Sequence, residues 1–127
     1  MARLHDLVVD SAHPAAAARF WAAALDDYAI APYDEAELAR LRELEIAGPE
    51  DDPTVLLEPR NSGPRFWFRL VPEPENGTNR LHLDLLATDI EAETRRLTEL
   101  GATVVARHDK NTVLTDPEGN EFCVFKG

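Results

Sequence analysis

The chain repeats one order of strands and a helix, and this internal repeat constrains its fold more than any other feature. Helices are expected at 15–25 in the first half and at 90–100 in the second. Strands are expected at 4–10, 54–57, 65–71, 80–87, 103–106, 111–115 and 121–125. Two copies of a βαβββ module predict an α+β fold. We expect both modules to build one curved mixed sheet, with helices on its outer face and a cleft on its inner face.

The boundary between the two modules is expected in the segment 72–77, PEPENG, which is the strongest break in the pattern. This divides a single domain of 127 residues into modules at about 1–74 and 75–127. The first module contains an additional helical stretch at 33–46. Asp34 is a suitable cap for that helix, and Gly48 followed by proline ends it. We interpret this helix as an insertion.

Superposing the modules predicts which side chains face the cleft. Aligning the helix starts at His13 and Asp89 places Asp6 on His82, and aligning the glycine turns places Trp67 on Cys123. Strict alternation over 80–87 puts Leu81, Leu83 and Leu85 on one face of the strand, and the other face carries His82, Asp84 and Leu86. The residues expected around one cavity are Asp6, Trp67, His82 and Cys123. A register slip of one residue would reverse this assignment.

Charge and composition exclude several classes of partner. The net charge of −11 repels phosphate backbones, so nucleic acid is not an expected partner. No run of about 20 apolar residues is present to span a bilayer. A single cysteine and no apolar leader favour a cytoplasmic protein. The acidic segment 49–53 is either a solvated turn between two prolines or a metal-binding loop, and the turn is favoured.

Several segments in order resemble the vicinal-oxygen-chelate superfamily, which includes glyoxalases, bleomycin-resistance proteins and dioxygenases. They are RLHLDL at 80–85, DIEAE at 89–93, LTELGA at 97–102 and DPEGNEFC at 116–123. VPEP at 71–74 and the pair Phe20–Trp21 are similar to the same group, and the small glyoxalase-like domain proteins match best. The resemblance covers the whole chain except the helix at 33–46.

The resemblance implies four possible metal-ligand positions, because metal-dependent superfamily members take two ligands from each module. Here these positions carry Asp6, Trp67, His82 and Cys123. His82 matches the superfamily pattern, whereas Trp67 cannot bind a metal and Cys123 replaces a glutamate. We therefore expect no cofactor. If a divalent metal is bound, its ligands should be Asp6, His82 and Cys123, a three-ligand pattern with an open position.

His82 and Trp67 each have a functional and a structural interpretation. His82 is the best candidate for a catalytic acid or base or for a ligand-binding donor. Alternatively, it is satisfied by Asp84 or Glu121 in a polar network. Trp67 provides a flat apolar wall on which an aromatic ligand can stack, or it simply fills the core.

Two arginines, Arg65 and Arg69, and the cysteine, Cys123, also have a functional and a structural interpretation. Arg65 is expected to pair with Glu121, which leaves Arg69 as the better candidate to hold a ligand carboxylate. Cys123 is a nucleophile with His82 as its base, or an inert buried side chain, and inert packing is the default. The predicted ligand-binding set is Asp6, Trp67, Arg69, His82, Asp84, Glu121 and Cys123.

Two functions fit this pattern. The first is a small-molecule binding protein of the bleomycin-resistance type, with its ligand in the cleft of the curved sheet. The alternative is a lyase, isomerase or dioxygenase-type enzyme of the same superfamily with an atypical metal site. We also expect a homodimer, since Phe20 and Trp21 on the alanine-rich helix, together with the leucines of the inserted helix, provide more apolar surface than one core needs.

Overall fold

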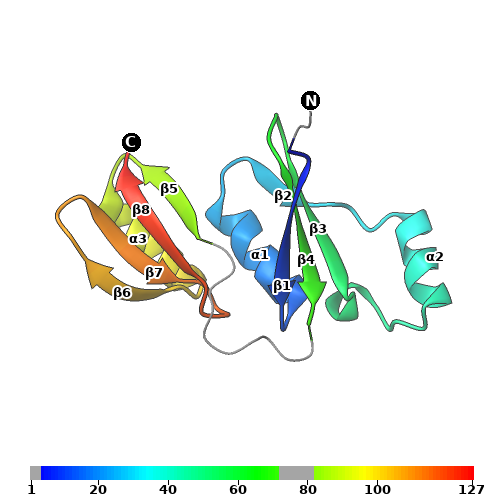
Figure 1. Cartoon of the computed structure of the whole chain (residues 1–127). Helices are drawn as coiled ribbons and strands as arrows, with labels where there is room; N and C mark the ends of the chain where they lie inside the picture. The colour runs from blue at the N-terminus through cyan, green and yellow to red at the C-terminus, as the bar shows by residue number, and fades with distance from the viewer. Residues whose placement is uncertain (1–3, 72–81) are drawn as a thin grey trace. The chain divides into compact units, whose positions relative to one another are not determined.

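The computed structural model describes residues 4–71 and 82–127. The chain forms two compact units, Met1–Pro74 and Glu75–Gly127, each with one four-stranded mixed sheet (Figure 1). The fold is α+β, with one βαβββ module in each unit, as the repeat predicts. The single curved sheet and the cleft between the modules stay predictions.

The first unit has the sheet order β1-β4-β3-β2. Its elements are β1 (Asp6–Ser11), α1 (Pro14–Ala24), β2 (Tyr28–Ile30), α2 (Glu35–Glu43), the 3-10 turn η1 (Pro49–Asp51), β3 (Thr54–Pro59) and β4 (Arg65–Leu70). Strand β1 is parallel to β4, and the other neighbours are antiparallel. Helix α1 begins with Pro14, where the missing N–H costs no hydrogen bond, and packs on β2, β3 and β4.

The second unit repeats this order as β5-β8-β7-β6. Its elements are β5 (Leu83–Ala87), α3 (Ile90–Leu100), β6 (Thr103–Arg107), β7 (Asn111–Thr115) and β8 (Glu121–Lys126). The Asp89 side chain caps α3 by accepting a hydrogen bond from the Ala92 N–H at 3.0 Å. Gly101 ends the helix at φ +120°, a conformation that favours glycine. The predicted bounds of this helix are confirmed.

The strand registers of the two units are equivalent. Leu7 lies opposite Phe66 in the β1–β4 pair, and Leu83 lies opposite Phe122 in the β5–β8 pair. One step along, Val8 lies opposite Trp67, just as Asp84 lies opposite Cys123. The alignment of Trp67 with Cys123 is therefore confirmed at the level of backbone pairing.

Each sheet buries one face against its own helix. In the first unit, Phe66 and Phe68 are 6% and 1% exposed and stack with ring centroids 6.4 Å apart. In the second unit, Leu97 of α3 is fully buried, as are Leu114 of β7 and Val124 of β8. Side chains that alternate with these point to the opposite side of the sheet, which we call the far face. Trp67 lies on the far face of the first sheet.

Three details differ from the sequence predictions. Strand β2 was not predicted, because three residues are too short to show alternation. Helix α2 is shorter than 33–46, although Asp34 caps it as expected, through a hydrogen bond from the Glu37 N–H. Phe20 and Trp21 are 4% and 2% exposed, so they belong to the buried core and not to a spare apolar surface. The predicted positions 80 and 81 lie outside the described residues.

Helix α2 lies to one side of the sheet, within the long connection between β2 and β3 (Figure 1). A buried carboxylate, Asp52, ties this connection to the unit. It accepts hydrogen bonds from the Tyr33 hydroxyl at 2.8 Å, from Arg40 Nη2 at 3.0 Å and from the Thr54 N–H at 3.0 Å. Of the acidic segment 49–53, Glu50 also has a partner, Arg19, which it binds through both oxygens. The segment is therefore a turn that anchors the insertion.

Among the described residues, no helix is both long enough and apolar enough to cross a membrane.

Candidate functional site

The far face of the first sheet carries a hydrogen-bonded group of Asp6, Arg65 and Trp67. Asp6 Oδ1 accepts from Arg65 Nε at 2.8 Å, and Asp6 Oδ2 accepts from Arg65 Nη2 at 3.0 Å. Trp67 Nε1 also donates to Asp6 Oδ2, at 3.0 Å. The parallel register explains the group, because Asp6 lies opposite Arg65, and Trp67 is the next residue of β4 on the same face.

This group fixes both the charge of Asp6 and the position of the indole. The hydrogen bond from Arg65 holds the pKa of Asp6 below its usual 3.8, against the opposing effect of burial. The Arg65 guanidinium lies 5.7 Å from the centre of the Trp67 ring, within the range of a cation–π contact. Trp67 is half-buried, so part of its ring remains accessible. The partner of Arg65 is thus Asp6, from its own module, where the sequence analysis expected Glu121.

His5 extends this group, which the sequence analysis did not expect. Its Nε2 lies 2.9 Å from Arg65 Nη2 and 3.7 Å from Asp6 Oδ1. His5 lies immediately before β1, which begins at Asp6, so strand alternation does not determine the direction of its side chain. Arg69 lies further along the same face of β4 and binds Asp10 at 2.7 Å through Nη2. Both side chains of that pair are more than a third exposed.

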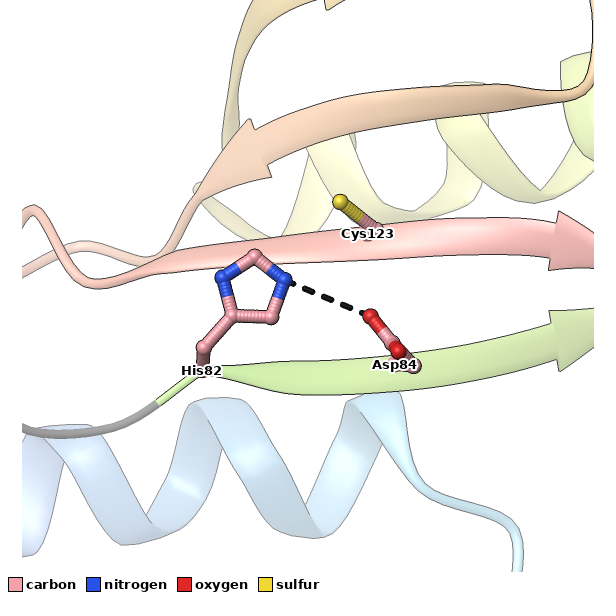
Figure 2. A group of neighbouring side chains, drawn as sticks. All are labelled: His82, Asp84 and Cys123. Carbon is pink, nitrogen blue, oxygen red and sulfur yellow. Dashed lines mark ion pairs between the residues drawn. The ribbon is translucent and has the colours of Figure 1, made fainter.

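The second sheet carries a different group on the equivalent face. His82, Asp84 and Cys123 each present a ligand atom, and these atoms all lie within 4.8 Å of one another. His82 Nε2 is 3.3 Å from Asp84 Oδ1. Figure 2 shows His82, just before β5, and Asp84 of β5 on the same side of the chain, beside Cys123 of the neighbouring strand β8. Cys123 is buried, whereas the other two side chains are exposed. Of the two partners proposed for His82, Asp84 is the one in contact.

Glu121, the remaining predicted site residue, is exposed at the start of β8, opposite Thr115 of β7.

A hollow of about 290 Å³ lies at the start of α1, lined by Ala12–Ala16, Leu70 and Glu50–Asp52. No sequence pattern predicted this hollow. Two of its carboxylates, Glu50 and Asp52, already bind arginines of the same unit. We therefore assign this hollow to the anchorage of the insertion.

Comparison with models of known protein families identifies the family of this chain. The family model of the glyoxalase-like domain matches residues 6–125. The chain belongs to this family. No curated protein matches the sequence.

Solved structures share the fold, among them two that are named as members of this superfamily. A glyoxalase/bleomycin resistance protein/dioxygenase family enzyme from Burkholderia phytofirmans superposes with a TM-score of 0.67 at 15% identity, over 98% of each chain. A superfamily member from Sphaerobacter thermophilus gives 0.61 at 18% identity, over 100% of this chain and 98% of that one. TioX from Micromonospora gives 0.60 at 13% identity, over 98% of each chain. At these identities the similarity shows the fold alone.

The first module of this glyoxalase-like domain does not fit the metal centre that the superfamily implies. Such a centre needs ligands from both modules, and the two positions in the first module are Asp6 and Trp67. Both oxygens of Asp6 are already bound by Arg65, and Trp67 has no atom that can bind a metal. A hard divalent ion needs several free oxygen or nitrogen ligands. The residues present therefore disagree with the four-ligand arrangement.

Proposed function

We propose that this glyoxalase-like domain is a small-molecule binding protein whose ligand lies against the far face of the first sheet. The observation that carries the proposal is the bonding of Asp6 to Arg65 and Trp67. It removes a carboxylate from metal ligation and uses it to hold an indole ring in one orientation. A pre-oriented aromatic surface lowers the entropy lost on binding, which is how rigid sites gain affinity.

The chemistry of the far face favours a planar aromatic or heterocyclic ligand with an anionic substituent. The accessible part of Trp67 offers a stacking surface. Arg69 lies two residues further along the same strand, with a side chain that is 58% exposed. Within residues 4–71 and 82–127, the carboxylate partner of Arg69 is Asp10, which leaves guanidinium N–H groups for a ligand carboxylate. Stacking at Trp67 combined with a charged contact at Arg69 would therefore select such compounds.

A thermal-shift titration with naphthalene-2-carboxylate and related aromatic carboxylates tests the proposal. A ligand that binds the native state raises the melting temperature in proportion to its occupancy. The substitution Trp67→Leu should abolish the shift, and Arg69→Gln should reduce it. Arg107→Gln, at an exposed arginine of the second unit, is the matched control and should leave it unchanged. A panel that produces no shift, or a shift that survives Trp67→Leu, would contradict the proposal.

The alternative function, a metal-dependent enzyme of the superfamily, has its specific support in the second module, where His82 and Cys123 approach each other. Asp6 discriminates between the two functions. If the chain is such an enzyme, Asp6 is a ligand, and Asp6→Asn weakens metal binding. If it is a binding protein, the same substitution leaves any metal affinity unchanged and alters the fluorescence of Trp67.

The expected homodimer and the cytoplasmic location stay predictions. The basis for the dimer changes, because the aromatic residues of α1 are buried. The exposed apolar surface includes Leu44, at the end of the inserted helix, which is 57% exposed, and Leu86 of β5, which is 75% exposed. Sedimentation at micromolar concentration tests the dimer. A monomer that persists at the highest concentration would end this idea.

A further inference from the structure

We propose that His82, Asp84 and Cys123 form a binding site for a thiophilic divalent metal such as Zn²⁺, complete within the second module. The proposal does not rest on the proposed function, because it involves no residue of the first unit. It also differs from the four-ligand centre of the superfamily. Asp84 takes part, the two positions of the first module do not, and a thiolate makes the site soft.

The backbone explains why these three residues meet. His82 immediately precedes β5, and Figure 2 shows its side chain on the same side as that of Asp84, the second residue of β5. Cys123 lies directly opposite Asp84 in the parallel β5–β8 register and shares that face. Adjacent strands lie about 4.8 Å apart, so a same-face pair is brought within reach of one ion. Two of the three ligands are thus brought together by the pairing of β5 with β8, and the third is the residue immediately before β5.

The separations suit a small tetrahedral ion after modest rotation of two side chains. Bonds of roughly 2.0–2.3 Å to nitrogen, oxygen and sulfur place neighbouring ligand atoms roughly 3.3–3.7 Å apart. His82 Nε2 and Asp84 Oδ1 are already 3.3 Å apart, and no pair in the group exceeds 4.8 Å. The side chains of His82 and Asp84 are 49% and 64% exposed, so they have room to turn toward the buried sulfur.

The donor set determines which metals the site prefers. One imidazole, one carboxylate and one thiolate suit Zn²⁺ and its analogues Co²⁺ and Cd²⁺, whereas Mg²⁺ and Ca²⁺ favour oxygen ligands alone. Two anionic ligands also compensate the charge of the ion, and the protein as a whole is acidic, at −11. Three protein ligands leave one coordination position for water or another small ligand.

Cobalt titration of the untagged chain tests the site. Bound Co²⁺ should give a thiolate-to-metal charge-transfer band in the near ultraviolet, with one ion per chain, and Zn²⁺ should displace it. Because the thiol must lose its proton to bind, the titration should also release protons into a weakly buffered solution. Mg²⁺ should neither produce the band nor compete for the site.

Substitution of each of the three residues tests which side chains bind the metal. Cys123→Ser should abolish the charge-transfer band. His82→Gln and Asp84→Asn should each weaken Zn²⁺ binding more than the roughly 10–100-fold that losing a supporting neighbour costs. His108→Gln, at an exposed histidine outside the group, is the matched control.

Cys123 is buried, and its replacement can disturb the fold. The test therefore depends on the two variants at exposed positions, His82→Gln and Asp84→Asn. Zn²⁺ affinities of His82→Gln and Asp84→Asn equal to that of the His108→Gln control would overturn the proposal. So would cobalt binding without a thiolate band, or no binding at all.

Discussion

Asp52 holds the connection that carries helix α2, and its replacement by alanine should destabilise the first unit by about 3 kcal/mol. The side chain is 1% exposed and accepts three hydrogen bonds. The bonds from the Tyr33 hydroxyl and the Thr54 N–H contribute about 1 kcal/mol each. A charge-assisted bond from Arg40 contributes roughly 1.5–3 kcal/mol when buried. Because the Arg40 side chain is 35% exposed, solvent screening reduces this to about 1 kcal/mol.

Urea denaturation followed by tryptophan fluorescence measures this loss. Both tryptophans, Trp21 and Trp67, belong to the unit that contains Asp52, so their signal reports on the relevant structure. A loss of 3 kcal/mol corresponds to a fall of about 10 °C in melting temperature for a domain of this size. Asp51→Ala, one position earlier and exposed, is the control and should change stability by no more than about 0.5 kcal/mol. If Asp52→Ala is no more destabilising than Asp51→Ala, the reasoning is refuted.

Two further predictions concern pH. Burial, followed by the hydrogen bond to Asp52, raises the pKa of Tyr33 above its usual 10.0. The native state therefore keeps a proton that the unfolded state releases, stability falls as the pH rises above 10.0, and Tyr33→Phe should flatten this fall in alkaline urea titrations. The pH dependence has the opposite sign in acid, because the hydrogen bond from Arg65 holds the pKa of Asp6 in the native state below 3.8. The stabilisation from this pair is complete above pH 3.8 and is lost as the pH falls through the native pKa of Asp6. Asp6→Asn should remove this part of the acid dependence, and an unchanged acid limb would argue against the Arg65 pair.

The elements that the sequence predicted well are those with local signals. Helix α3 was predicted with its observed bounds because Asp89 and Gly101 mark its ends. The face of Trp67 was predicted by aligning the two glycine turns, and the buried phenylalanines on either side of it in β4 agree with that face. Strand β2 was missed because its three residues carry no periodic signal.

The site was predicted only in part, because its contacts depend on which strands are neighbours. Asp6 and Arg65 are 59 residues apart in the sequence, and their pairing follows from the parallel β1–β4 register. Pseudo-symmetry alone pointed to Glu121 as the partner of Arg65. Asp84 was included as a ligand-binding residue, but its approach to Cys123 required the β5–β8 register. The residue pattern of one sequence does not show which strands pair, so it gives neither the β1–β4 nor the β5–β8 register directly.

The equivalent registers of the two modules define where the insertion lies and what it costs. The connection between β6 and β7 is residues 108–110, whereas the equivalent connection between β2 and β3 is residues 31–53. If both connections were flexible, closing the longer one would cost roughly 2 kcal/mol more in conformational entropy than closing the shorter one. The bonds to Asp52 stabilise the ordered form of this connection. The inserted helix is therefore an addition to a hairpin loop, and such a loop can change in length and sequence while the paired strands on either side keep their register.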